Sequence, residues 1–101
     1  MNLEDYNLKM NREEEKTIIN FVDEYILADP FFKTLSRKAQ KETRKTFIVV
    51  MRAVFKANNY PNVIPVIFAH SYQAAEVIAD AMNKVSQIIP NVERIRIQIT
   101  N

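Results

Sequence analysis

The chain contains no glycine, although average usage of about 7% would place roughly seven in a sequence of this length. Motifs that need glycine for a tight turn or a close backbone approach are therefore excluded, namely the GxxxxGK phosphate loop, the GxGxxG dinucleotide turn and the GxSxG nucleophile elbow. Where the backbone needs a positive φ angle, we expect asparagine to provide it. The candidates are Asn58, Asn59, Asn62 and Asn91.

Cysteine is also absent, so the chain cannot form a disulfide framework, a catalytic thiolate or a zinc site of the zinc-finger type. No apolar run approaches about eighteen residues, and the N-terminal sequence MNLEDYNLKM lacks the basic flank and apolar core of a signal peptide. We therefore expect a soluble, cytoplasmic protein. Its small size and its many Asn and Ile residues fit an AT-rich phage or viral source.

The composition that remains is that of a folded domain. Apolar residues make up 48% and charged residues 26% of the 101 positions, which are ordinary globular values. We expect one domain over residues 1–101, with residues 1–10 as a flexible N-terminal segment.

The net charge of +2 hides a segregation of charge along the chain. Through Pro30 there are eight acidic and three basic residues, and from Phe31 to Tyr60 there are eight basic and one acidic. This asymmetry indicates either an acidic partner for the middle segment or ion pairing between the first two segments.

The first half of the chain predicts two helices. Asn11 can cap a helix over about residues 12–28, with Glu14 completing a capping box and Pro30 stopping the run. In the connector DPFFKTLS, Asp29 can cap a single turn that Pro30 opens, and Ser36 can cap a second helix over about residues 37–58. Because the connector is short, we expect the two helices to be antiparallel.

The second half predicts a strand, a helix and a strand. VIPVIFA, residues 63–69, is a short apolar strand, and Ser71 can cap a third helix that Pro90 ends. The expected core stripe of that helix is Ala74, Ile78, Ala81, Met82, Val85 and Ile88. In VERIRIQIT the isoleucines alternate with polar residues, which is typical of a half-buried strand.

The order of elements is therefore α-α-β-α-β. We predict an α+β fold in which an N-terminal helical hairpin packs on a small parallel βαβ sheet. Because two strands alone make a marginal sheet, either residues 3–10 add a weak strand or a second protomer completes the sheet. Pro65 cannot donate to a ladder, so we expect it at an edge position or at a bulge.

The second predicted helix carries a basic stripe. At about 100° per residue, seven cations fall within an arc of roughly 140°, namely Arg37, Lys38, Lys41, Arg44, Lys45, Arg52 and Lys56. Three explanations remain open: pairing with Asp23, Glu24 and their neighbours on the first helix, binding to a phosphate backbone, or binding to an acidic protein surface.

The same helix is apolar nearly all round from Phe47 to Phe55. Ile48, Val49 and Phe55 fall on or beside the basic arc, so they indicate either an oligomer interface or burial between the first helix and the sheet.

Three further sets of residues could carry chemistry. His70 and Ser71 follow the first strand and open the third helix, so they form a candidate anion site. Glu76 and Asp80 stand four residues apart and could share a divalent cation, although a solvated helix face is the simpler interpretation. Arg94 and Arg96 alternate on the last strand and could extend the basic surface.

We expect a protein that binds rather than catalyses, with no cofactor, no metal and no membrane partner. The leading hypothesis is a regulatory or accessory protein that binds nucleic acid through Arg37, Lys38, Lys41, Arg44, Lys45, Arg52, Arg94 and Arg96. The alternative is a homo-oligomeric interaction module or inhibitor that binds an acidic protein surface. A minor alternative is a metal-dependent nuclease or nucleotide-binding enzyme that uses His70, Glu76 and Asp80. We expect a homodimer or larger oligomer.

Overall fold

A computed structural model describes residues 8–100 of the chain. The elements in chain order are α2 (Arg12–Phe21), a π-helical turn (Val22–Ile26), α3 (Pro30–Lys33), α4 (Arg37–Asn59), β1 (Val66–Ala69), α5 (Tyr72–Ser86), a 3₁₀ turn (Val92–Arg94) and β2 (Arg96–Ile99). The predicted α+β fold is confirmed. Most of the expected N-terminal strand, residues 3–10, lies outside the described residues.

The predicted helix starts are confirmed by their capping hydrogen bonds. The Asn11 side chain accepts from the Glu14 N–H at 2.9 Å, and the Glu14 carboxylate accepts from the Asn11 N–H at 3.0 Å, which is a capping box. The Ser36 and Ser71 hydroxyls accept from the backbone N–H three residues on, at 3.2 and 3.1 Å. These caps bind backbone donors that a helix itself leaves unpaired.

The first helix changes form near its end. It was predicted as one helix to residue 28, but the α-helical part ends at Phe21 and the chain continues as a π-helical turn to Ile26. In this turn the ring of Tyr25 stacks on that of Phe21 with 5.0 Å between centroids, and Tyr25 is 66% exposed. π-helical turns are rare and often occur at functional sites.

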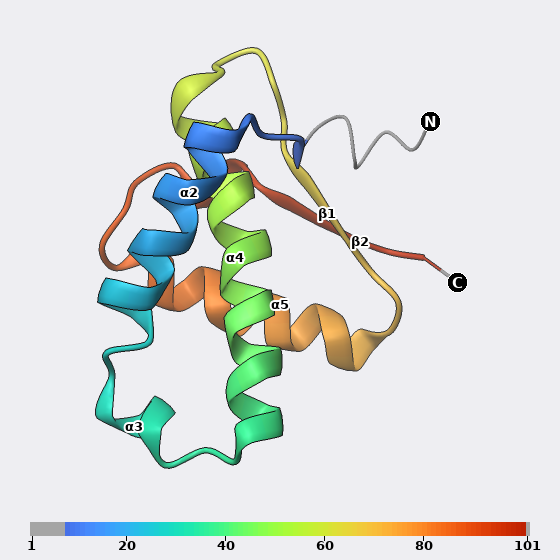
Figure 1. Cartoon of the computed structure of the whole chain (residues 1–101). Helices are drawn as coiled ribbons and strands as arrows, with labels where there is room; N and C mark the ends of the chain where they lie inside the picture. The colour runs from blue at the N-terminus through green and yellow to red at the C-terminus, as the bar shows by residue number, and fades with distance from the viewer. Residues whose placement is uncertain (1–7, 101) are drawn as a thin grey trace.

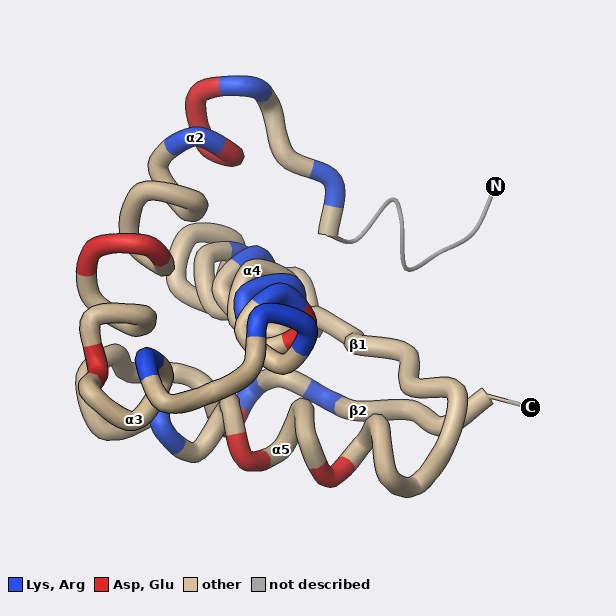
Figure 2. Tube along the Cα trace, turned by 60° about the horizontal axis from the view of Figure 1, so that its bottom comes forward, with Lys and Arg blue, Asp and Glu red and all other residues tan. Residues whose placement is uncertain are grey.

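The helices and the sheet surround α4. Figure 1 shows α2 running antiparallel beside α4, with α5 crossing α4 and the strands on the other side. β1 and β2 are parallel, as predicted, with Ile67 opposite Ile97 and Ala69 opposite Ile99. The view along α4 in Figure 2 places α2 and the strands on opposite sides of this helix.

Both strands are shorter than the sequence predicts. The ladder begins after Pro65, which has no N–H but whose carbonyl accepts from the Arg96 N–H at 2.9 Å. Pro65 therefore lies at the start of β1, one of the positions that a sheet tolerates for proline. The second strand begins at Arg96 because Val92–Arg94 form a 3₁₀ turn.

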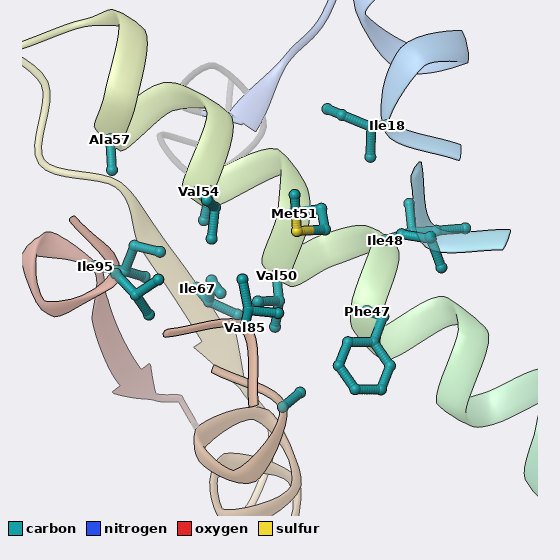
Figure 3. Packing of buried hydrophobic residues seen from close by; sticks show 14 residues of the cluster. Ile18, Phe47, Ile48, Val50, Met51, Val54, Ala57, Ile67, Val85 and Ile95 are labelled. Atoms are coloured by element: carbon teal, nitrogen blue, oxygen red, sulfur yellow. The ribbon is translucent and has the colours of Figure 1, made fainter. Parts of the chain in front are cut away.

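One hydrophobic cluster holds these elements together. Val50 and Val54 of α4 point toward Ile67 of β1 and Val85 of α5, and all four are at most 2% exposed (Figure 3). On the other side of α4, Ile18 and Val22 bring the first helix into the same cluster.

The apolar half of α4 is therefore enclosed by elements of the same chain. Ile48 is 9% exposed and lies beside the first helix (Figure 3). Val49 and Phe55 are half-buried and pack against the cluster. Ile88, which was predicted in the core, is 60% exposed because α5 ends at Ser86.

Candidate functional site

The basic stripe of α4 divides into residues that pair within the chain and residues that do not. Arg44 forms a bidentate ion pair with Asp23 of the π-helical turn, with Nε–Oδ1 at 2.9 Å and Nη2–Oδ2 at 3.1 Å. These hydrogen bonds lower the pKa of the Asp23 carboxyl, partly against the effect of burial, and raise the pKa of Arg44. At Arg44, therefore, the first of the three explanations is confirmed: an acid of the first helical segment pairs with the basic stripe.

A second bidentate pair lies two turns further along α4. Arg52 donates from Nε to both carboxylate oxygens of Glu15, at 2.9 and 3.1 Å, and Nη2 also contacts this carboxylate. Lys56 lies over the ring of Tyr60 at 4.4 Å from its centroid, a cation–π contact. The C-terminal half of the stripe is thus occupied by contacts within the chain.

Arg94 lies in the 3₁₀ turn before β2, so the expectation that it alternates with Arg96 on one face of the last strand is wrong. The 3₁₀ turn directs its side chain to the end of α4, where it donates to the carbonyl oxygens of Ala57, Pro61 and Val63, the last two at 2.8 and 2.9 Å. The Ala57 carbonyl is among the last four of α4, which have no partner within the helix. Arg94 therefore caps α4 and holds the following loop, and only Arg96 is exposed.

Four cations at the N-terminal half of α4 keep their charge exposed, namely Arg37, Lys38, Lys41 and Lys45. They make no ion pair within residues 8–100. Figure 2 shows this basic group at the end of α4 that faces the viewer. Glu24, the other acid expected to neutralise the stripe, is also exposed and forms no ion pair in the described part of the chain.

Three of these cations surround an open hollow of about 680 Å³, which we call the basic hollow. Its apolar lining comes from Leu27, at the end of the π-helical turn, and from Phe32 of the connector. Its polar lining comes from Arg37, Lys38, Gln40, Lys41 and Arg44 of α4. Gln40 fixes the connector to the helix because its Nε2 donates to the carbonyls of Phe32 and Leu35 at 3.3 and 3.2 Å. Apart from the cations themselves, no feature of the sequence predicted this hollow.

A second, larger hollow of about 740 Å³ lies between the connector, α4 and α5. We call it the aromatic groove; it shares Leu27 and Phe32 with the basic hollow. Tyr25, Phe31 and Ile88 line it and are 66%, 63% and 60% exposed. Of the two neighbouring phenylalanines of the connector, Phe31 is exposed and Phe32 is half-buried.

The remaining candidates lie apart from these hollows. His70 follows β1 and is exposed, and the hydroxyl of Ser71 is occupied as the cap of α5. Glu76 and Asp80 are exposed on α5, and among the described residues no group of three His, Asp or Glu side chains could hold a metal ion.

Comparison with protein-family models, with curated proteins and with solved structures found no match for this chain. In the part of the chain that the structure describes, none of the helices has the length and apolar character needed to cross a membrane.

Proposed function

We propose that this protein is an interaction module that binds an acidic, partly apolar segment of a partner protein in the basic hollow. The observation that carries the proposal is the combination of an apolar lining, from Leu27 and Phe32, with a rim of exposed cations, Arg37, Lys38 and Lys41. An apolar side chain of the partner would enter the hollow, and flanking carboxylates would pair with the rim.

The charges of the hollow support an anionic partner. Arg44 contributes to its lining but already shares its charge with Asp23, whereas the other three cations have no ion pair within the described residues. Carboxylates of a partner could therefore form ion pairs with the guanidinium and ammonium groups at the rim. Exposed cations steer an acidic partner and raise its association rate, an effect that salt screens.

Nucleic acid is the competing ligand class, and the arrangement of the cations favours it less. From Arg37 to Lys45 the helix rises about 12 Å, which covers only three or four phosphates of one DNA strand. Of the eight residues predicted to bind nucleic acid, Arg44, Arg52 and Arg94 are engaged within the chain. Four phosphate contacts would give a log–log salt slope of about −3.6.

The test is an NMR titration of the ¹⁵N-labelled protein with a designed peptide in which Glu and Asp flank Leu and Phe. It is run at about 150 mM salt, as suits the cytoplasmic location that the sequence predicts. We expect shifts of the backbone amides of Leu27, Phe32 and the first two turns of α4. A parallel titration uses a random DNA duplex and a random single strand.

Matched charge reversals make the test specific. Lys41→Glu, at the rim, should weaken peptide binding about tenfold or more, which corresponds to about 1.4 kcal/mol. Lys16→Glu, an exposed cation of α2 away from the hollow, should leave it unchanged. Binding of the duplex in preference to the peptide, with the same loss for Lys41→Glu, would refute the proposal in favour of nucleic acid.

A further inference from the structure

The aromatic groove exposes apolar side chains that the basic hollow does not use. Of the seven large apolar side chains that are most exposed in the described part of the chain, Tyr25, Phe31 and Ile88 line this one groove. We propose that the groove is the contact surface between two copies of this chain, related by a twofold axis that brings Phe31 of each copy into the groove of the other. This proposal is independent of the one for the basic hollow.

The exposed area fits the core of such a contact. A large aromatic side chain presents about 150–250 Å², so Tyr25 and Phe31 together leave roughly 250 Å² open to solvent at their exposed fractions of 66% and 63%. A stable interface takes about 800 Å² from each partner. The two rings supply about a third of that area. Ile88 and the other apolar residues that line the groove, whose volume is about 740 Å³, add to it.

The charges of the groove favour a second copy over an acidic or basic partner. Among its lining residues the charged ones are Asp29 and Lys84, one of each sign. In a twofold dimer the same surface patch of each copy contacts the other. Asp29 of one copy can therefore pair with Lys84 of the other, and the symmetry repeats this pair. The Asp29 Oδ1 accepts from the Phe31 N–H at 2.9 Å, and Oδ2 accepts no hydrogen bond within the described residues.

The groove is also fixed before binding. The Thr34 hydroxyl donates to the Phe31 carbonyl at 2.7 Å, and Gln40 holds the connector through the carbonyls of Phe32 and Leu35. The stacking of Phe21 on Tyr25 orients the second ring. Because the connector backbone and the Tyr25 ring are held in place, association has to order little of the groove beyond the Phe31 side chain, and this lowers the entropic cost of binding.

Sedimentation of the full chain over a concentration series up to about 500 µM tests the dimer. We expect a mass that rises to twice the 11.8 kDa of the chain. Phe31→Ala should weaken the dimer about thirtyfold or more, as expected for an aromatic residue at the centre of an interface. Tyr72→Ala, which removes a 78% exposed ring outside the groove, should leave the dissociation constant unchanged.

A charge reversal tests the twofold arrangement itself. Lys84→Glu places two acids opposite each other in the dimer and should weaken it at least about tenfold, whereas Lys84→Arg, which keeps the charge, should retain most of the affinity. Circular dichroism confirms that each variant is folded. A wild-type chain that stays monomeric, or a dimer that resists both Phe31→Ala and Lys84→Glu, would overturn the proposal.

Discussion

Replacing Arg94 with alanine should destabilise the protein far more than the same change at Arg96, two residues away. The Arg94 guanidinium donates to three carbonyls, those of Ala57, Pro61 and Val63, and hydrogen bonds to charged groups contribute about 1.5–3 kcal/mol each but do not add fully. We therefore expect a loss of about 2–4 kcal/mol in the free energy of unfolding. The exposed Arg96 side chain should contribute within about 0.5 kcal/mol.

The assay is thermal unfolding followed by circular dichroism at neutral pH. For a chain of this size, 1 kcal/mol corresponds to about 5 °C in Tm, so Arg94→Ala should lower Tm by about 10–20 °C and Arg96→Ala by less than about 3 °C. Arg94→Lys should recover only part of the loss, because an ammonium group cannot match the planar fork that reaches three carbonyls. Equal Tm values for the two alanine variants would refute the role of Arg94 as the C-terminal cap of α4.

Three further predictions concern the core, an ion pair and a turn. Ile67→Ala should cost about 2–5 kcal/mol in a urea titration because it leaves a cavity in the core, and the exposed Val77→Ala should cost less than about 0.5 kcal/mol. Because Arg44 lowers the folded-state pKa of Asp23, the stabilisation by this half-exposed pair is full above the ordinary carboxyl pKa of about 3.9 and is lost as the pH falls through the lowered value. Asp23→Asn should therefore be less stable than wild type by up to about 1 kcal/mol at pH 7, and this gap should narrow as the pH falls below the ordinary carboxyl pKa; a gap that does not narrow would contradict the pairing. Asn91→Ala should cost about 1–2 kcal/mol, because Asn91 holds φ at 71° and its side chain donates to Asn58, whereas Asn91→Gly, which tolerates this angle, should cost less by the same titration.

The features that depend on local chemistry could be predicted from the sequence. Asn11, Ser36 and Ser71 cap helices as expected because each satisfies backbone donors within three residues of itself. Of the four asparagines named as candidates for a positive φ angle, Asn91 adopts one, and Asn58, Asn59 and Asn62 do not. The parallel pairing of the strands followed from the βαβ order.

The features that depend on contacts between distant residues could not be predicted in detail. The sequence indicated that acids of the first helix could neutralise α4, but the relative position of the two helices decides that Asp23 reaches Arg44 and that Glu15 reaches Arg52. The alternating sequence places Arg94 in the last strand, but it lies in a 3₁₀ turn that directs its side chain to the end of α4. The aromatic groove depends on the π-helical turn and on the end of α5 at Ser86, and neither has a strong local signal.

The measurement that tests the central claim most directly is the affinity of the acidic peptide for paired charge-reversal variants of α4, determined by fluorescence anisotropy. Lys41→Glu should weaken binding about tenfold or more while changing Tm by less than about 3 °C, because Lys41 is exposed and forms no ion pair within the described residues. Arg52→Glu should lower Tm and leave the affinity within about twofold, because its guanidinium already pairs with Glu15. Equal affinities for wild type and Lys41→Glu would contradict the account.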